Sequence, residues 1–338
     1  MPRVIARAVP LRLVWLLVAL AALVLACAAS IAIGAKPIPL EHVVDALRGG
    51  LDGGDAFIVR ETRAPRALLG VLVGAALGVA GALIQAFTRN PLADPGILGV
   101  NAGAAFAVTI GIVGFGVTSI VGTVWFAFIG AAVVTVLVYV LGTAGRGSVS
   151  PIQLTLVGVA VGALLGGITS GITLLNPGAF DQMRGWGAGT LSGRGWEVLA
   201  GVAPFLVVGL VLACLLGPAL NIVALGDELA GALGARVLRT RILVIVAVTV
   251  LSGAATAAAG PIGFVGLMVP HVARWFVGPD QRWILAFTLV LAPLLLTLAD
   301  VVGRLVVAPQ EVQVGIVTAL IGAPVLVALA RRTKVSGL

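Results

Sequence analysis

Residues 66–87 read RALLGVLVGAALGVAGALIQAF, and residues 88–96 continue as TRNPLADPG. The first stretch carries no charge after Arg66 and has about 20 residues, the length of a helix that spans a bilayer. Its glycines and alanines are small enough to let membrane helices pack closely. The second stretch interrupts the apolar run with glycine and proline, and a new apolar run starts at residue 97. Together they predict a membrane helix, a sharp break and a second helix.

The composition of the whole chain agrees with a membrane protein. Of its 338 residues, 60% are hydrophobic and only 10% are charged, whereas a soluble domain carries about 25% charged residues. A soluble fold of this size could not bury so much apolar surface, so lipid must surround most of the chain. The net charge is +8, but the arginines lie between apolar runs, which indicates membrane topology rather than binding to nucleic acid.

Ten apolar runs follow one another without a large soluble insertion. An even number of spans places both termini on the same side of the membrane. With the N-terminus inside, the inner segments hold 13 lysines and arginines and the outer segments hold 8, as the positive-inside rule predicts. The expected runs are 13–33, 66–87, 97–115, 119–142, 152–175, 197–216, 241–259, 262–277, 284–302 and 313–330.

A weak internal repeat relates the two halves of the chain. Residues 81–99 read GALIQAFTRNPLADPGILG, and residues 260–271 read GPIGFVGLMVPH. In each half a Gly/Pro break precedes a short helix, and the two breaks fall on opposite sides of the expected membrane. Inverted repeats with broken helices are typical of transporters, although such breaks also arise by chance in glycine-rich membrane proteins.

The sequence holds no motif that would let this chain use ATP itself. A P-loop needs a lysine after a glycine-rich turn, and neither Lys36 nor Lys334 has that context. ATP and Mg²⁺ would therefore bind to a partner ATPase. Ion-coupled transport places ionisable residues inside the membrane, and here Asp300 is the nearest candidate. Because Arg304 lies one helical turn further on, an ion pair at the outer surface is the simpler interpretation.

The sequence also predicts no catalytic residue, no metal site and no cofactor bound by this chain. The two histidines, His42 and His271, have unrelated spacing, and Cys27 and Cys214 lie within apolar runs. No nucleophile with a base occurs in a span, which argues against a membrane enzyme.

One inner segment has a distinct pattern. Residues 220–234 read LNIVALGDELAGALG, which predicts a small amphipathic helix bounded by glycines. Asp227 and Glu228 lie near its start, where the helix dipole favours negative charge. The segment is either an ordinary interhelical loop or a coupling helix, a rigid knob that docks into a groove on a cytoplasmic ATPase.

From about Arg60 to Arg332 the chain resembles the FecCD-type permeases, which include the vitamin B12, iron-siderophore and haem permeases. The resemblance rests on a series of motifs in one order. They are RAPR (63–66), GAALG (74–78), TRNPLADPG (88–96), LGV (98–100), LGDELA (225–230), AGPIGFVGLMVPH (259–271), LADVVGR (298–304) and VGIVTALIGAP (314–324).

The resemblance implies a ten-helix permease that works as a homo- or heterodimer. Two cytoplasmic ABC ATPase subunits would drive it, and an extracytoplasmic binding protein would deliver its cargo. The cargo would pass along the dimer interface, lined by the fifth and tenth helices, 152–175 and 313–330.

The resemblance also implies roles for particular residues. Arg63, Arg66 and Arg304 would dock acidic residues of the binding protein, the alternative being arginines that only snorkel at the membrane surface. The remaining matches are Asn90, Leu92, Ser148 and Ser150 for the cytoplasmic gate, and Gly226, Asp227, Glu228 and Leu229 for coupling to the ATPase.

We therefore expect residues 1–338 to form a single all-α permease domain with an internal inverted repeat. It would lie in the inner membrane of a bacterium, surrounded by lipid, with both termini in the cytoplasm. The expected cargo is a ferric siderophore, with haem and cobalamin as alternatives inside the family. An ion-coupled secondary transporter is the alternative from another class.

Overall fold

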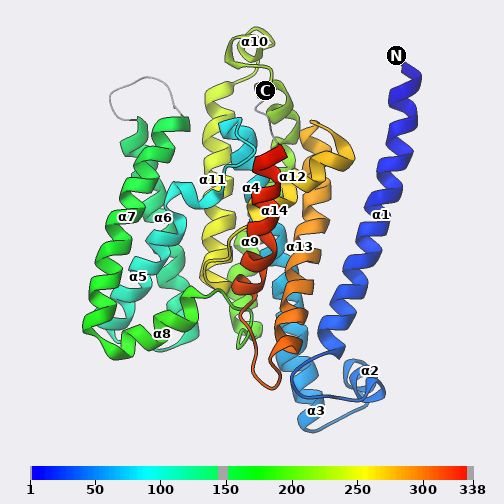
Figure 1. The fold of residues 1–338 in the computed structure, drawn as a ribbon, viewed down its shortest axis with the longest axis vertical. Helices are drawn as coiled ribbons and strands as arrows, with labels where there is room; N and C mark the ends of the chain where they lie inside the picture. The colour runs from blue at the N-terminus through cyan, green and yellow to red at the C-terminus, as the bar shows by residue number, and fades with distance from the viewer. Residues whose placement is uncertain (1, 144–150, 333–338) are drawn as a thin grey trace.

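The computed structural model describes residues 2–143 and 151–332, and every regular element in these two ranges is helical. Ten longer helices form a bundle (Figure 1), and each of them covers one of the ten predicted apolar runs, which confirms the all-α fold. They are α1 (Pro2–Ala32), α4 (Ala64–Thr88), α5 (Val100–Phe115), α6 (Ile120–Thr143), α7 (Pro151–Leu175), α9 (Trp196–Val223), α11 (Val237–Ala259), α12 (Val265–Val277), α13 (Gln281–Val306) and α14 (Val314–Arg332).

Short helices lie at the two ends of the bundle. At one end are α2 (Leu40–Arg48), α3 (Gly54–Phe57) and α8 (Pro177–Gly187). At the opposite end, toward which the start of α1 also lies, is α10 (Asp227–Ala232) (Figure 1). A π-helical turn, η1 (Ile58–Arg63), leads into α4, and a 3₁₀ turn, η2 (Pro95–Leu98), leads into α5.

By length and composition, seven helical segments in the described ranges can cross a membrane, and three more apolar helices are shorter. Two of the short ones, α5 and α12, follow the Gly/Pro breaks. The sequence predicted helices from residues 97 and 262, but they start three residues later in the structure. The backbone explains the delay at α12, because Gly260 and Phe264 both have positive φ, at +74° and +67°, which a helix cannot continue through.

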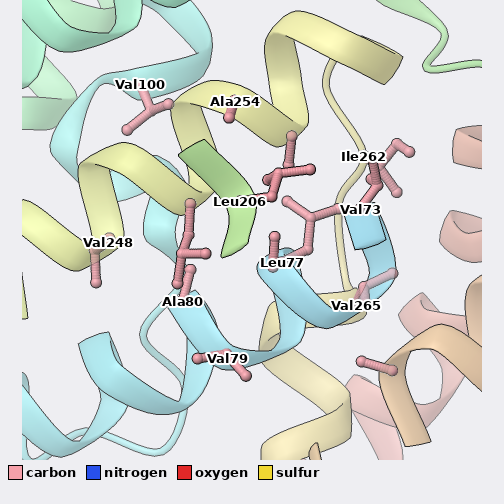
Figure 2. Packing of buried hydrophobic residues seen from close by; sticks show 14 of the residues in the cluster. Val73, Leu77, Val79, Ala80, Val100, Leu206, Val248, Ala254, Ile262 and Val265 are labelled. Atoms are coloured by element: carbon pink, nitrogen blue, oxygen red, sulfur yellow. The ribbon is translucent and has the colours of Figure 1, made fainter. Parts of the chain in front are cut away.

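The centre of the bundle is α4. In its most apolar window 83% of the residues are buried, against 17% in α7. Figure 2 shows Val73, Leu77 and Ala80 of α4 packed near side chains of α9 and α11, such as Leu206 and Val248. A helix buried on nearly all sides fixes the positions of its neighbours, whereas α7 leaves most of its apolar surface uncovered.

Small residues allow α4 to lie directly against α12, the helix that follows the second Gly/Pro break. A methyl group added at Gly81 would overlap the backbone of Gly266 in α12, and one added at Gly74 would lie 2.7 Å from the Cα of Pro293 in α13. These contacts join the backbones themselves, so a neighbouring side chain cannot relieve a clash by rotating. Through Gly74 and Gly81, α4 thus packs directly against helices of the second half of the chain.

Replacing Gly81 by alanine should therefore destabilise the bundle. We expect the free energy of unfolding to fall by about 1–3 kcal/mol, as for other overpacked interiors. Thermal unfolding of the purified protein in detergent measures this. Gly201→Ala in α9 is the control, because a methyl group there meets nothing within 4 Å. Equal melting temperatures for the two variants would contradict the prediction.

Candidate functional site

The segment expected to couple to an ATPase forms a knob at one end of the bundle (Figure 1). It is shorter than predicted, since α9 continues to Val223 and α10 covers only Asp227–Ala232. Gly226 separates the two helices with φ +108°, a conformation that favours glycine. Within α10, Ala230 is buried, while Leu229 is 60% exposed.

Two residues of the knob have different surroundings although they are adjacent. Asp227 accepts hydrogen bonds from Arg89 (Nη2–Oδ1, 2.8 Å) and from Arg241 (Nη2–Oδ2, 2.7 Å). Glu228 is exposed beside Leu229. Asp227 therefore anchors α10 to the bundle while Glu228 faces outward, and the coupling role of both residues stays a prediction.

Arg89 connects the knob to the loop that follows α4. It has a left-handed backbone (φ 51°) at the end of that helix and also donates to the carbonyl of Val223 (3.0 Å). The next residue, Asn90, accepts a hydrogen bond from the backbone N–H of Leu92 (2.9 Å), and Leu92 is 43% exposed. Sequence reasoning missed the contact between Arg89 and Asp227, which joins segments 138 residues apart.

The expected gate residues are thus described only in part. Asn90 and Leu92 lie in the loop tied to the knob, and their role in a gate stays a prediction. Ser148 and Ser150, the other two, lie outside the described residues.

The outer arginines form an internal cluster at the end of the bundle opposite the knob. Arg66 donates to Asp300 (Nη2–Oδ1, 2.8 Å) and to Glu311 (Nη1–Oε2, 2.8 Å). Arg304 pairs with the other oxygen of Asp300 and donates to the backbone carbonyl of Ser30 (2.7 Å). These contacts tie together the ends of α1, α4 and α13.

Arg63 is held in a similar way. Its guanidinium donates to the carbonyls of Ile31 (3.0 Å) and Ala32 (2.7 Å) at the end of α1. Arg63, Arg66 and Arg304 are only 4%, 7% and 1% exposed. The expected surface position of these three arginines is therefore wrong, because internal carbonyls and carboxylates occupy their donors. The predicted ion pair between Asp300 and Arg304 is confirmed, although it lies in the interior.

A shallow hollow runs along the side of α14, the tenth long helix. Its volume is about 560 Å³, and small residues provide most of its walls. The neighbouring helix surface is apolar and uncovered, with Leu320 70% exposed. Such a face suits lipid or another membrane helix. The lining residues are Gly187, Ala188, Pro261, Gly315, Ile316, Ala319, Leu320, Ala323 and Pro324.

Within residues 2–143 and 151–332, no three His, Cys, Asp or Glu side chains lie close enough to hold a metal ion. Cys27 and Cys214 are free thiols. The features that do occur are a bundle of membrane-length helices, two helices that follow breaks, an exposed knob at one end and an uncovered small-residue face. They define a polytopic α-helical membrane protein.

The model of the FecCD transport family matches residues 22–332, and the chain belongs to that family. It is 51% identical over 316 residues to the ferric enterobactin transport system permease protein FepD of Escherichia coli, covering 93% of this chain and 94% of the relative. It is 40% identical over 326 residues to the Fe(3+)-citrate import system permease protein YfmD of Bacillus subtilis, covering 96% of each.

A solved structure has the same fold. It is described as an inward-facing conformation of a transporter of the metal-chelate ABC type, and it matches with a TM-score of 0.82 at 27% identity, covering 94% of this chain and 99% of that one. As a member of this family, the chain is a membrane permease subunit of an ABC transporter and is not itself an enzyme.

Proposed function

We propose that this chain is the membrane-spanning subunit of an importer that carries a ferric siderophore into the bacterial cytoplasm. The observation that carries the proposal is its similarity, over nearly its whole length, to the ferric enterobactin permease. The iron-citrate relative is also named for an iron chelate. Haem and cobalamin are the alternatives within the family.

In the proposed assembly two copies of the permease, or this chain and a paralogue, meet along the uncovered faces of α7 and α14. The cargo passes between them by alternating access. The hollow along α14 and the exposed Leu164 and Leu320 support this role, since such small and apolar walls would let a large chelate slide without strong binding.

Two cytoplasmic ATPase subunits drive the cycle in this proposal. The exposed Glu228 and Leu229 dock into the ATPase, and the ion pair between Asp227 and Arg89 passes its movement to the loop of Asn90. ATP and Mg²⁺ belong to the ATPase. Movement can be transmitted in this way because a charge-assisted contact joins two otherwise separate segments.

The orientation follows from charge. The end of the bundle with α10 carries Arg89, Arg236, Arg239 and Arg241, as expected for a cytoplasmic end. The first residues of α1 and the last turn of α14 lie toward the same end (Figure 1), so both termini face the cytoplasm in this proposal and the protein spans the inner membrane.

A binding protein delivers the cargo at the opposite end. The outer cluster combines three arginines with Asp300 and Glu311, so its formal charge is 3 − 2 = +1. Arg63, Arg66 and Arg304 are proposed to aid docking through this positive potential, which steers an acidic partner over a distance, rather than by direct contact.

Purification from native membranes in mild detergent, followed by uptake in liposomes, tests the proposal. We expect an ATPase to co-purify in roughly equal amount, and ATP to drive uptake of radiolabelled ferric siderophore delivered by the binding protein. A second permease in the complex would identify a heterodimer. Uptake of haem or cobalamin instead would show that the cargo is one of these and not a ferric siderophore. Uptake by this chain alone, driven by a proton or sodium gradient, would refute the ABC mechanism and support a secondary transporter.

A further inference from the structure

A second pocket lies beside the hollow of α14, at the end of the bundle away from the knob. Its volume is about 280 Å³. Its walls come from α5, the start of α6, α8, the segment between α8 and α9, and Gln313 just before α14. The pocket and the hollow adjoin at the end of α8, because Trp186 lines the pocket and Gly187 lines the hollow.

The pocket contains a buried positive charge without a counterion. Arg194 is only 9% exposed, and its Nε is buried without a hydrogen-bond partner. Among the described residues no carboxylate forms an ion pair with it, and burial alone lowers the pKa of its guanidinium. A buried charge left in this state is unfavourable, so the site is suited to a ligand that brings negative charge.

Neutral donors accompany the arginine. The indole Nε1 of Trp186 is also buried without a partner, and the side-chain amides of Gln182 and Gln313 line the same pocket. The side chains that line it include no acid. A planar guanidinium together with N–H donors recognises the oxygens of an anion such as a carboxylate or a phenolate.

We propose that this pocket binds an anionic oxygen group of the iron chelate as the cargo enters the outer end of the pathway. The inference rests on the proposed function for the identity of the cargo. Ferric iron is a hard cation that chelators hold through anionic oxygens, and a complex with more such oxygens than the metal neutralises is an anion. Because the pocket is smaller than a typical ligand site, it accommodates one edge of the chelate.

Calorimetric titration of the assembled importer in detergent, without the binding protein, tests the pocket directly. Two probes of similar shape are used, the trianionic tris(catecholato)gallium(III) and the neutral tris(maltolato)gallium(III). We expect the assembly to bind the anionic complex more tightly. Arg194→Gln should weaken that binding about tenfold or more, as for the loss of a charged hydrogen bond, and leave the neutral complex unaffected.

Three further variants separate a binding role from a structural one. Arg194→Lys keeps the charge and should retain part of the preference. Trp186→Phe removes one neutral donor and should weaken anion binding by a few-fold. Arg184→Gln is the matched control, because Arg184 lies on nearby α8 with its side chain 75% exposed, and it should change nothing.

Equal weakening for both probes, or none for either, would overturn the inference. So would an Arg194→Gln assembly that binds the anionic complex normally but no longer captures the binding protein, because the pocket would then receive an acidic side chain of that protein. If the wild-type pocket binds the anion while ATP-driven siderophore uptake is absent, the proposed function fails and the pocket stands as an anion site.

Discussion

Asp227→Arg should abolish ATP-driven uptake while the ATPase subunits continue to hydrolyse ATP. The new side chain would lie between Arg89 and Arg241, which both donate to the native carboxylate at 2.7–2.8 Å. Like charges at these distances repel, so α10 would lose its attachment to the loop after α4 and to α11. We expect uptake per ATP hydrolysed to fall about tenfold or more, a typical size for the coupling between two sites.

A charge exchange tests the mechanism of this loss. Arg89→Asp added to Asp227→Arg restores opposite charges across the contact and should recover part of the uptake. Glu228→Arg is the comparison at the adjacent, exposed position; it should weaken binding of the ATPase without loosening α10. Uptake and hydrolysis are measured together in liposomes. Normal coupling in the Asp227→Arg protein would show that the contact transmits nothing.

Asp300→Asn should have the largest effect on stability. The carboxylate of Asp300 is the shared counterion of Arg66 and Arg304, and all three side chains are at most 8% exposed. Without it, two buried guanidinium groups face each other and only Glu311 remains to balance Arg66. Breaking a buried ion pair in this way costs about 3–5 kcal/mol, so we expect a much lower melting temperature and little folded protein.

Two comparisons show whether charge is the cause. Adding Arg304→Gln to Asp300→Asn removes one positive charge with the negative one and should recover part of the stability. Asp55→Asn removes a carboxylate that pairs with the exposed Lys36 at 2.7 Å, so it should lower the melting temperature far less than Asp300→Asn does. Thermal unfolding in detergent measures all three proteins. If the Asp300→Asn protein has the same melting temperature as the wild type, the cluster does not hold α1, α4 and α13 together.

The prediction for Asp300 also shows how far the sequence can be read. The four-residue spacing of Asp300 and Arg304 predicted their ion pair, because a helix brings such residues to one face. The partner Arg66 is 234 residues away, and no local pattern joins it to Asp300. The same distance explains why these arginines were expected at the surface, since only packing shows that the end of α1 covers Arg63 and Arg304.

For the coupling segment, too, the sequence predicted the element but not the contacts of its charged residues. Glycines and two acids in residues 220–234 predicted a knob, and the structure has one. Its exact length depended on Gly226, whose positive φ ends the preceding turn. Which acid faces a partner was decided by Arg89 and Arg241, which approach Asp227 from two other helices. Arg194 likewise gave no signal in the sequence, because its lack of a partner depends on the elements around it.

The sequence by itself determined ten apolar helices, their order, the two breaks and the family. The reason is that hydropathy, glycine and proline act locally, over a few neighbouring residues. The tertiary structure alone decided which charges are buried and which partner each one has. The physical reason is that the free energy of a charge depends on the groups within a few ångströms of it, and in this bundle those groups come from helices far apart along the chain.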